Sequence, residues 1–276
     1  MSQTATIFTR TGAVRIELPD VNAELMRGVR WGAIDALPTP AYFACQVFAR
    51  RLLGRPPEYR LGRSLMEEVG ACLLGGHGIP ARVGIAAYEH LRARGAFGKV
   101  ACSMKQLEAW LKEPLQIGTS TVRYRFAAQK ACYLAAALPL VRHAPPLTVG
   151  RDLRDWLLQL PGIGHKTASW VARNWLGADD VAIVDIHIMR VGQAVGLFPR
   201  DCTVERHYPA LEQLFLDFSS RLDVRASELD AVIWSEMASS PLAIRCLLEH
   251  LRESQGLSSP RRRERGLPGT SSRASV

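Results

Sequence analysis

A helix-breaking turn between two amphipathic segments constrains this chain more than any other feature of its sequence. Residues 151–160 carry apolar side chains at helical spacing, and the same spacing resumes after Gly164. Between these segments, Pro161 cannot continue the first helix, and Gly162 and Gly164 accept backbone angles that other residues avoid. The sequence therefore predicts a helix, a tight hairpin and a second helix.

The start of the second helix is a candidate anion site. A helix N-terminus presents unpaired N–H groups and the positive end of the helix dipole, and two glycines let a phosphate approach the backbone. Lys166 lies in the first turn of this helix, and Asp185 follows the apolar run 181–184, with His187 two residues further on. Because glycines alone are equally consistent with a simple turn, the interpretation depends on Lys166 and Asp185.

The stretch LPGIGHKTAS, followed by VDIHIMR, resembles the signature of the helix-hairpin-helix DNA glycosylases. It is most similar to the 8-oxoguanine DNA glycosylase/lyase branch, including its bacterial and archaeal members. The match is strong over residues 151–190, weaker but collinear over 65–140 and 208–239, and poor near both ends of the chain. The resemblance implies a mainly helical, two-lobed fold with a DNA-binding cleft. It also implies base-excision repair on double-stranded DNA by a monomer.

Helical periodicity covers most of the chain, and Val14–Leu18 alternates enough for one strand without a sheet partner. Outside the hairpin, we expect helices at 65–74, 80–94, 104–111, 124–138, 205–218 and 226–237. Together with the resemblance, this predicts four parts. They are a short irregular N-terminal extension packed on the C-terminal lobe (1–64), a middle helical lobe (65–140), a helix-hairpin-helix catalytic lobe (141–255) and a disordered basic tail (256–276).

Lys166 and Asp185 carry the chemistry that the resemblance implies. Loss of a damaged base builds positive charge at the anomeric carbon, which a nearby carboxylate stabilises. A neutral amine can attack the same carbon and form an imine, after which the 3′ phosphate is eliminated. Lys166 is the only lysine between Lys130 and the C-terminus, and an arginine cannot form an imine. The alternative is that Lys166 only contacts phosphate and Asp185 only caps a helix.

The resemblance also implies residues that bind the DNA backbone. Those expected at a phosphate are the hairpin residues Gly162, Ile163, Gly164 and His165, together with His187. The glycines and Ile163 would offer backbone N–H groups, and the hairpin carbonyls would suit a bound cation.

An enzyme acting on a base in a duplex must flip that base into a pocket, where stacking on apolar or aromatic side chains is usual. Asp230 and Trp234 are four residues apart on an expected helix, so they share a face and resemble the base pocket of the 8-oxoguanine branch. Trp170 and Gln46 are further candidates for this pocket, and His77 is a candidate wedge into the duplex. For all five residues, core packing or plain surface exposure is the competing interpretation.

Composition is consistent with a nucleic-acid partner but adds little. The net charge is +9 and the isoelectric point about 9.6, and residues 256–276 contribute five arginines and one glutamate. No apolar run is long enough for a membrane span and residues 1–10 lack a signal-peptide core, so we expect a cytoplasmic protein.

The six cysteines, with neighbours 27 to 70 residues apart, argue against zinc, disulfides and a four-thiolate iron–sulfur cluster, so no cofactor is expected. Two other functions compete with an 8-oxoguanine glycosylase/lyase. One is a related glycosylase for another damaged or modified base, and the other is a non-catalytic helix-hairpin-helix module. Lys166 and Asp185 argue against the module. The scattered cysteines and the pair Asp230 and Trp234 argue against another lesion.

Overall fold

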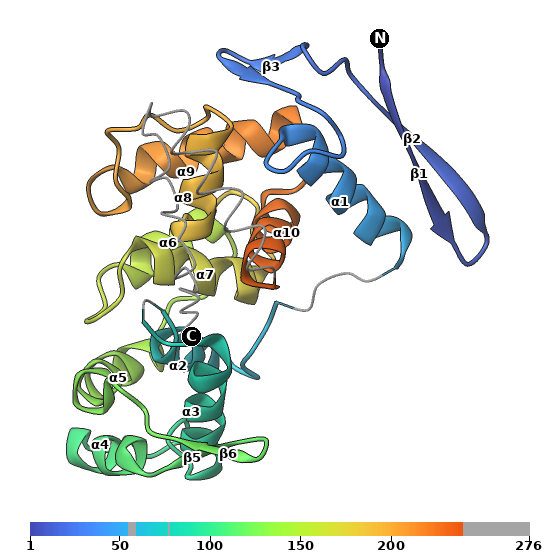
Figure 1. The fold of residues 1–276 in the computed structure, drawn as a ribbon. Coiled ribbons are helices and arrows are strands. Elements are labelled where there is room, and N and C mark those ends of the chain that lie inside the picture. The colour runs from blue at the N-terminus through green and yellow to red at the C-terminus, as the bar shows by residue number, and fades with distance from the viewer. Residues whose placement is uncertain (55–58, 77, 240–276) are drawn as a thin grey trace, which may run out of the picture.

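Helices dominate the computed structural model of the protein, which describes residues 1–54, 59–76 and 78–239 (Figure 1). The helices are α1 (Pro40–Leu52), α2 (Leu65–Leu74), α3 (Ala81–Ala93), α4 (Met104–Lys112), α5 (Ala127–Val141), α6 (Gly150–Leu157), α7 (His165–Leu176), α8 (Ile186–Ala194), α9 (Val204–Arg221) and α10 (Ala226–Ser239). The expectation of a mainly helical chain is confirmed. The candidate wedge His77 and the basic tail 256–276 lie outside the described residues.

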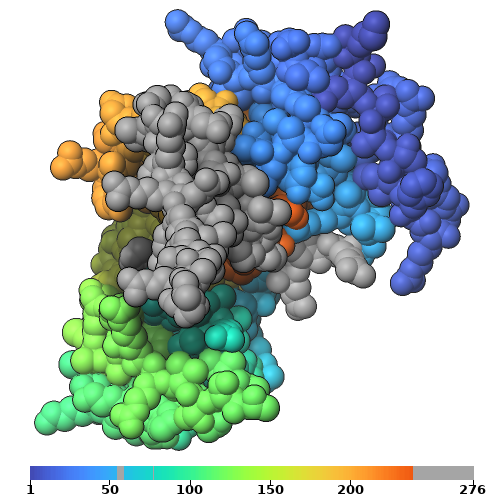
Figure 2. All heavy atoms as spheres, viewed as in Figure 1, coloured from blue at the N-terminus to red at the C-terminus, as the bar shows by residue number. Residues whose placement is uncertain are grey.

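Two apolar clusters fill the interior and divide the helices into two groups. One cluster joins the N-terminal residues 18–47 with residues 182–237, and the other is formed by residues 69–181. In the space-filling view, the middle helices gather at one end of the molecule and the N-terminal residues at the other (Figure 2). The chain passes from one cluster to the other immediately before Asp185. This crossing places Asp185 at the junction of the two groups.

The first 54 residues are more regular than expected. The single strand expected at Val14–Leu18 is part of β2 (Gly12–Leu18), which pairs antiparallel with β1 (Gln3–Thr9) in a hairpin that extends beyond the helices (Figure 1). β1 is rich in threonine, so its alternation is weak in the sequence even though Ala5 packs on the first cluster. A second, short hairpin in this segment pairs β3 (Glu24–Met26) with β4 (Val29–Arg30). Another short hairpin lies among the middle helices and pairs β5 (Leu115–Ile117) with β6 (Ser120–Val122).

The N-terminal segment packs on the helices that follow the hairpin. Leu18, Trp31 and Phe43 are buried in the same cluster as side chains of α8, α9 and α10. Whether the lobes divide at residues 64, 140 and 255 stays a prediction. In the apolar packing, α6 and α7 belong with the middle helices and not with α8 to α10.

One expected helix end is wrong. The sequence predicted that the helix beginning near residue 124 stops before Pro139, but α5 continues to Val141 with Pro139 inside its last turn. Proline there removes only one N–H donor, and Arg142 still donates to Leu138 O at 3.1 Å. The burial of Leu138 and Val141 in the second cluster favours the extra turn.

Candidate active site and DNA interface

The predicted hairpin is present between α6 and α7. Gly162 has φ of +80°, a conformation that side chains other than glycine rarely adopt, and a Cβ added there would lie 2.2 Å from the ring of Tyr133 on α5. Ile163 is buried in the second cluster and holds the turn from within, while Gly162 and Gly164 are exposed. The turn is therefore fixed by packing from the middle lobe and leaves a bare backbone facing outward.

The backbone groups at this turn are only partly used. Ile163 N donates to Leu160 O at 3.2 Å, so that amide is already bonded within the turn, contrary to the expectation that it faces a phosphate. Gly164, the N-cap of α7, offers no side-chain cap, and the first N–H groups of α7 have no partner among the described residues. Gly164 and the first turn of α7 therefore present the free N–H groups that an anion requires, and phosphate binding there stays a prediction. Three hairpin carbonyls accept no hydrogen bond from another described residue: those of Pro161, Gly162 and Ile163. They are available to coordinate a cation, and the binding of a cation there stays a prediction.

Lys166 lies in this first turn and is half-buried. Its amine makes no hydrogen bond or ion pair with any other described residue. A half-buried, unpaired amine beside an anion site is consistent with a nucleophile near DNA and not with a structural ion pair.

Asp185 is the N-cap of α8 and is 8% exposed. One of its oxygens, Oδ1, accepts from His187 N at 2.8 Å and from Ile188 N at 2.9 Å. The capping role that competed with catalysis is therefore present, and it leaves Oδ2 without a hydrogen bond to another described residue. The cap orients the carboxylate.

The segment leading to Asp185 is extended but belongs to no sheet, so its backbone groups need other partners. Two side chains of α9 supply them. The Tyr208 hydroxyl donates to Ala182 O at 2.7 Å and accepts from Val184 N at 3.2 Å. Glu212 Oε1 accepts from Ala182 N at 3.0 Å. These bonds fix the segment immediately before the predicted catalytic carboxylate.

The same two side chains connect this segment to α7. Glu212 Oε1 also accepts from the Ser169 hydroxyl at 2.9 Å, and Glu212 Oε2 accepts from Arg154 Nη1 at 2.5 Å. The ring of Tyr208 stacks on that of His165, with centroids 5.1 Å apart. His165 precedes Lys166 directly, so Tyr208 touches both the start of α7 and the segment that ends at Asp185. Tyr208 and Glu212 thereby tie together the two parts of the chain that carry the predicted catalytic pair.

Sequence reasoning missed Tyr208 and Glu212. One signal for them exists: Glu212 falls on the apolar face of α9, in line with buried Tyr208 and Phe215. A carboxylate at such a position is expected to have a buried partner.

Asp230, on α10, is 4% exposed and pairs with Arg173 of α7, whose Nη1 donates to Asp230 Oδ1 at 2.5 Å. Burial raises the pKa of Asp230 to about 7. The nearby carboxylates of Asp185 and Asp179 also act to raise it, whereas Arg173 acts against them. α10, which carries Asp230, packs against α8, which Asp185 caps. Sequence reasoning did not identify Arg173.

Three side-chain atoms are buried without any hydrogen-bond partner among the described residues: His165 Nδ1, His187 Nδ1 and Asp230 Oδ2. All three belong to residues predicted from the sequence to contact DNA or a base. A buried polar group without a partner costs about 1–3 kcal/mol. Their concentration at the predicted site is typical of groups that a ligand satisfies.

The other candidates lie around α10 and the hairpin. Trp234, one turn after Asp230, is 47% exposed, so its ring is available for stacking. Gln46 is half-buried on α1, midway between Tyr42 and Arg50, which both bond to Glu236 of α10. Because residues four apart share a helix face, Gln46 lies on the face of α1 directed at α10.

Trp170 has a different environment. Its side chain packs against the second apolar cluster, and its ring lies against Gly75 at the end of α2. This favours core packing beside the loop that contains residue 77 over a position in the base pocket.

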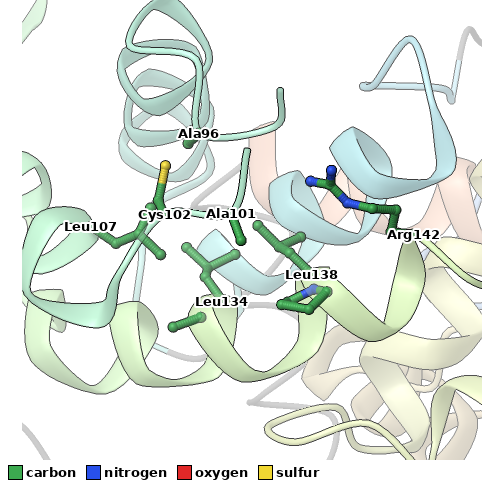
Figure 3. Close-up of a pocket in the computed structure, with 9 residues that line it drawn as sticks. Ala96, Ala101, Cys102, Leu107, Leu134, Leu138 and Arg142 are labelled. Carbon is green, nitrogen blue, oxygen red and sulfur yellow. The ribbon is translucent and has the colours of Figure 1, made fainter. Parts of the chain in front are cut away.

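Two hollows in the described part of the structure contain no predicted site residue. One, of about 10 Å³, lies between α4 and α5 beside Cys102, Leu134 and Arg142, and it holds at most one water molecule (Figure 3). The other, of about 260 Å³, lies beside Gly28, Arg30 and Val195. The candidate base pocket rests on unsatisfied polar atoms and an exposed ring.

Within the described ranges, no three His, Cys, Asp or Glu side chains are arranged to hold a metal ion. The five described cysteines carry free thiols. In the same ranges, no helix combines the length and the apolar character needed to cross a bilayer.

The glycine hairpin leads into α7, which carries Lys166, and the Asp185 carboxylate caps the following helix, α8. This arrangement defines a helix-hairpin-helix protein with the fold of the DNA glycosylases. The family model described as 8-oxoguanine DNA glycosylase (Ogg-HhH) matches residues 58–224, well over half of the chain. The protein belongs to this family.

Individual relatives agree with this assignment. An 8-oxoguanine DNA glycosylase/AP lyase of Methanocaldococcus jannaschii is 36% identical over 85 residues, which are 29% of this chain and 40% of that protein. The crystal structure of the M. jannaschii 8-oxoguanine glycosylase/lyase with a 15mer DNA containing 8-oxoguanine matches with a TM-score of 0.51 and 26% identity. That match covers 64% of this chain and 81% of the other. The 8-oxoguanine DNA glycosylase of Thermotoga maritima shares the fold, with a TM-score of 0.54, 22% identity and coverage of 72% and 97%.

Proposed function

We propose that the protein is a base-excision repair enzyme that removes 8-oxoguanine from double-stranded DNA and then cleaves the strand as an AP lyase. The observation that carries the proposal is the pairing of Lys166 and Asp185 at the starts of α7 and α8, joined through Tyr208. Family membership and the DNA-bound relative support the choice of substrate.

In the proposed reaction, Gly164 and the first turn of α7 hold a DNA phosphate next to the lesion. The flipped base enters between α1 and α10, where Trp234 stacks on it and Asp230 Oδ2 accepts a hydrogen bond from it. Gln46 offers its amide to the purine edge. His165 and His187, each with a ring nitrogen that lacks a partner, lie close to the DNA backbone.

The charged Asp185 stabilises the positive character that develops at the anomeric carbon as the glycosidic bond breaks. The neutral Lys166 amine forms a bond to that carbon, and the base leaves with the bonding electrons and takes up a proton. The sugar ring then opens to an imine. Loss of a C2′ proton drives elimination of the 3′ phosphate, and water releases the sugar fragment from Lys166.

We further propose that the enzyme acts as a monomer in the cytoplasm and without a cofactor. An iron–sulfur cluster of the usual kind needs four cysteine ligands. In this sequence only two cysteines, Cys202 and Cys246, follow Asp185.

Borohydride trapping on a duplex that contains 8-oxoguanine tests the proposed function. The wild type should form a covalent protein–DNA adduct, and Lys166→Gln should form none while still binding the duplex. A wild type that gives no adduct with this duplex or with a pre-formed abasic site contradicts the lyase activity. An adduct only with the abasic site contradicts 8-oxoguanine as substrate. An adduct only with another damaged base indicates a related glycosylase.

A further inference from the structure

Asp230 uses only half of its hydrogen-bonding capacity. Its Oδ1 is occupied by Arg173 Nη1 at 2.5 Å, whereas Oδ2 is buried and accepts no hydrogen bond from a described residue. Because the side chain is 4% exposed, Oδ2 is unpaired for lack of a partner and not because water covers it. The residue therefore offers one oriented and unpaired oxygen.

Arg173 makes two further contacts besides its pair with Asp230. Its Nε donates to Asn174 Oδ1 at 3.0 Å, and its guanidinium carbon lies 4.3 Å from the centre of the Tyr59 ring. Asn174 Nδ2 in turn donates to Glu68 Oε1 of α2 at 2.7 Å. The guanidinium is thereby fixed between two side chains and cannot turn away from Asp230 without breaking these contacts.

Glu68 extends this chain of contacts into the middle lobe. It is fully buried, and its other oxygen accepts from Leu61 N at 2.8 Å and Gly62 N at 2.7 Å. Glu68, Asn174, Arg173 and Asp230 therefore form a continuous polar chain from α2 through α7 to α10. The orientation of Asp230 is set by both lobes.

The protonation state of Asp230 decides what it can recognise. An ionised carboxylate only accepts hydrogen bonds, whereas a protonated one also donates. A guanine-type base presents N–H donors at N1 and at its 2-amino group, whereas an adenine-type base presents an acceptor at N1. Burial of the site opposes the charge, as do the carboxylates of Asp185 and Asp179, whereas Arg173 of α7 and a hydrogen bond from the Ile183 backbone favour it.

We propose that Arg173 is a positioning residue for specificity: it orients Asp230 and favours its charged form, so that Oδ2 accepts an N–H of a guanine-type base and rejects an adenine-type edge. The inference rests on the proposed base excision. Arg173 touches no reacting atom and acts through Asp230 alone.

Two reactions measured side by side test this proposal: single-turnover base release from an 8-oxoguanine duplex, and cleavage of a duplex with a pre-formed abasic site, which places no base in the pocket. Arg173→Met should slow base release by about 10- to 100-fold, the usual loss for a hydrogen bond to a charged group. Cleavage of the abasic duplex should change by less than about twofold. Arg173→Lys should restore part of the base release.

A double variant separates positioning from folding. In Asp230→Asn, adding Arg173→Met should cause no further loss, because the carboxylate through which Arg173 acts is absent. The selectivity for 8-oxoguanine over 8-oxoadenine should also fall in Arg173→Met. Arg154→Met, which breaks another buried arginine–carboxylate pair, is the matched control and should slow both reactions.

Equal loss of both reactions in Arg173→Met would overturn the inference, as would a full further loss in the double variant. Unchanged base release in Arg173→Met would overturn it while leaving the proposed function intact. A wild type that cleaves abasic DNA but releases no 8-oxoguanine would overturn the proposed function and, with it, this inference.

Discussion

Two buried arginine–carboxylate pairs flank the candidate site, and they are satisfied to different degrees. Glu212, paired with Arg154, has both oxygens occupied, because Ser169 and Ala182 N also donate to it. Asp230, paired with Arg173, keeps one oxygen without a partner. A fully bonded buried network is rigid, whereas a half-bonded one costs stability unless a ligand completes it. We infer from this difference a division between a scaffold that positions the proposed catalytic pair and a surface that reads the base.

This contrast assigns different consequences to the two regions. Changes in the region of Glu212 alter where Asp185 and Lys166 lie, so they affect every step that uses those residues. Changes in the region of Asp230 alter only what the pocket accepts. The following variants test this separation.

The largest expected loss comes from Asp185→Asn. It removes the charge that stabilises the transition state and should slow base release by roughly 10²- to 10³-fold. Asparagine caps a helix about as well as aspartate, so α8 and the melting temperature should be preserved. Single-turnover kinetics and thermal unfolding measure the two effects. Unchanged base release would leave Asp185 with its capping role alone.

Tyr208→Phe tests the scaffold. Loss of the hydroxyl removes the bonds to Ala182 O and Val184 N, so Asp185 should move relative to Lys166 and both reactions should slow by roughly 10-fold. Tyr124→Phe is the matched control, because it deletes another buried hydroxyl that donates to Leu74 O in the middle lobe. The two variants should lose similar stability but differ in activity. Equal activity in both would contradict the positioning role of Tyr208.

The two hairpin glycines should separate folding from DNA binding. At Gly162, φ is +80° and a Cβ would meet the Tyr133 ring, so Gly162→Ala should destabilise the fold by about 2 kcal/mol or more. At Gly164, a Cβ meets nothing within 4 Å, so Gly164→Ala should fold normally yet weaken duplex binding several-fold by crowding the phosphate. Denaturant unfolding and fluorescence anisotropy measure these effects. Normal DNA affinity in Gly164→Ala would place the phosphate elsewhere.

Asp230 should also give the protein a pH dependence of stability. The pKa of Asp230 is raised from its usual 3.8 to about 7, so the stability that this group contributes is present below about pH 4 and lost as the pH rises through 7. The wild type should therefore lose up to about 4 kcal/mol over this range relative to Asp230→Asn. Urea unfolding of both proteins at about pH 5 and about pH 8 measures the difference. An identical pH dependence would indicate that Asp230 keeps its ordinary pKa.

The sequence was sufficient for the parts of the site that are local in the chain. Proline, glycine and helical periodicity predicted the hairpin, and Lys166 and the cap at Asp185 follow within twenty-five residues of it. Most helices followed from periodicity alone, while α5 ran past Pro139 because burial of Val141 outweighed one lost hydrogen bond.

The rest depends on contacts between residues far apart in the sequence. Tyr208 forms a hydrogen bond with Ala182, 26 residues away, and Arg173 pairs with Asp230, 57 residues away. Both contacts form only when the chain folds. Periodicity cannot pair such residues, although a glutamate on the apolar face of α9 was a sign that Glu212 has a buried partner. β1 was missed for a related reason: its strand is apparent only once its partner β2 is in place.

The most direct test of the separation between scaffold and base pocket compares Glu212→Gln with Asp230→Asn in the same two assays. Each variant removes one carboxylate charge from a buried arginine pair and keeps the side-chain shape. Glu212→Gln should slow base release and abasic-site cleavage by similar factors. Asp230→Asn should slow base release alone. A similar ratio of the two rates in both variants would contradict the division of the site into a scaffold and a base-reading pocket.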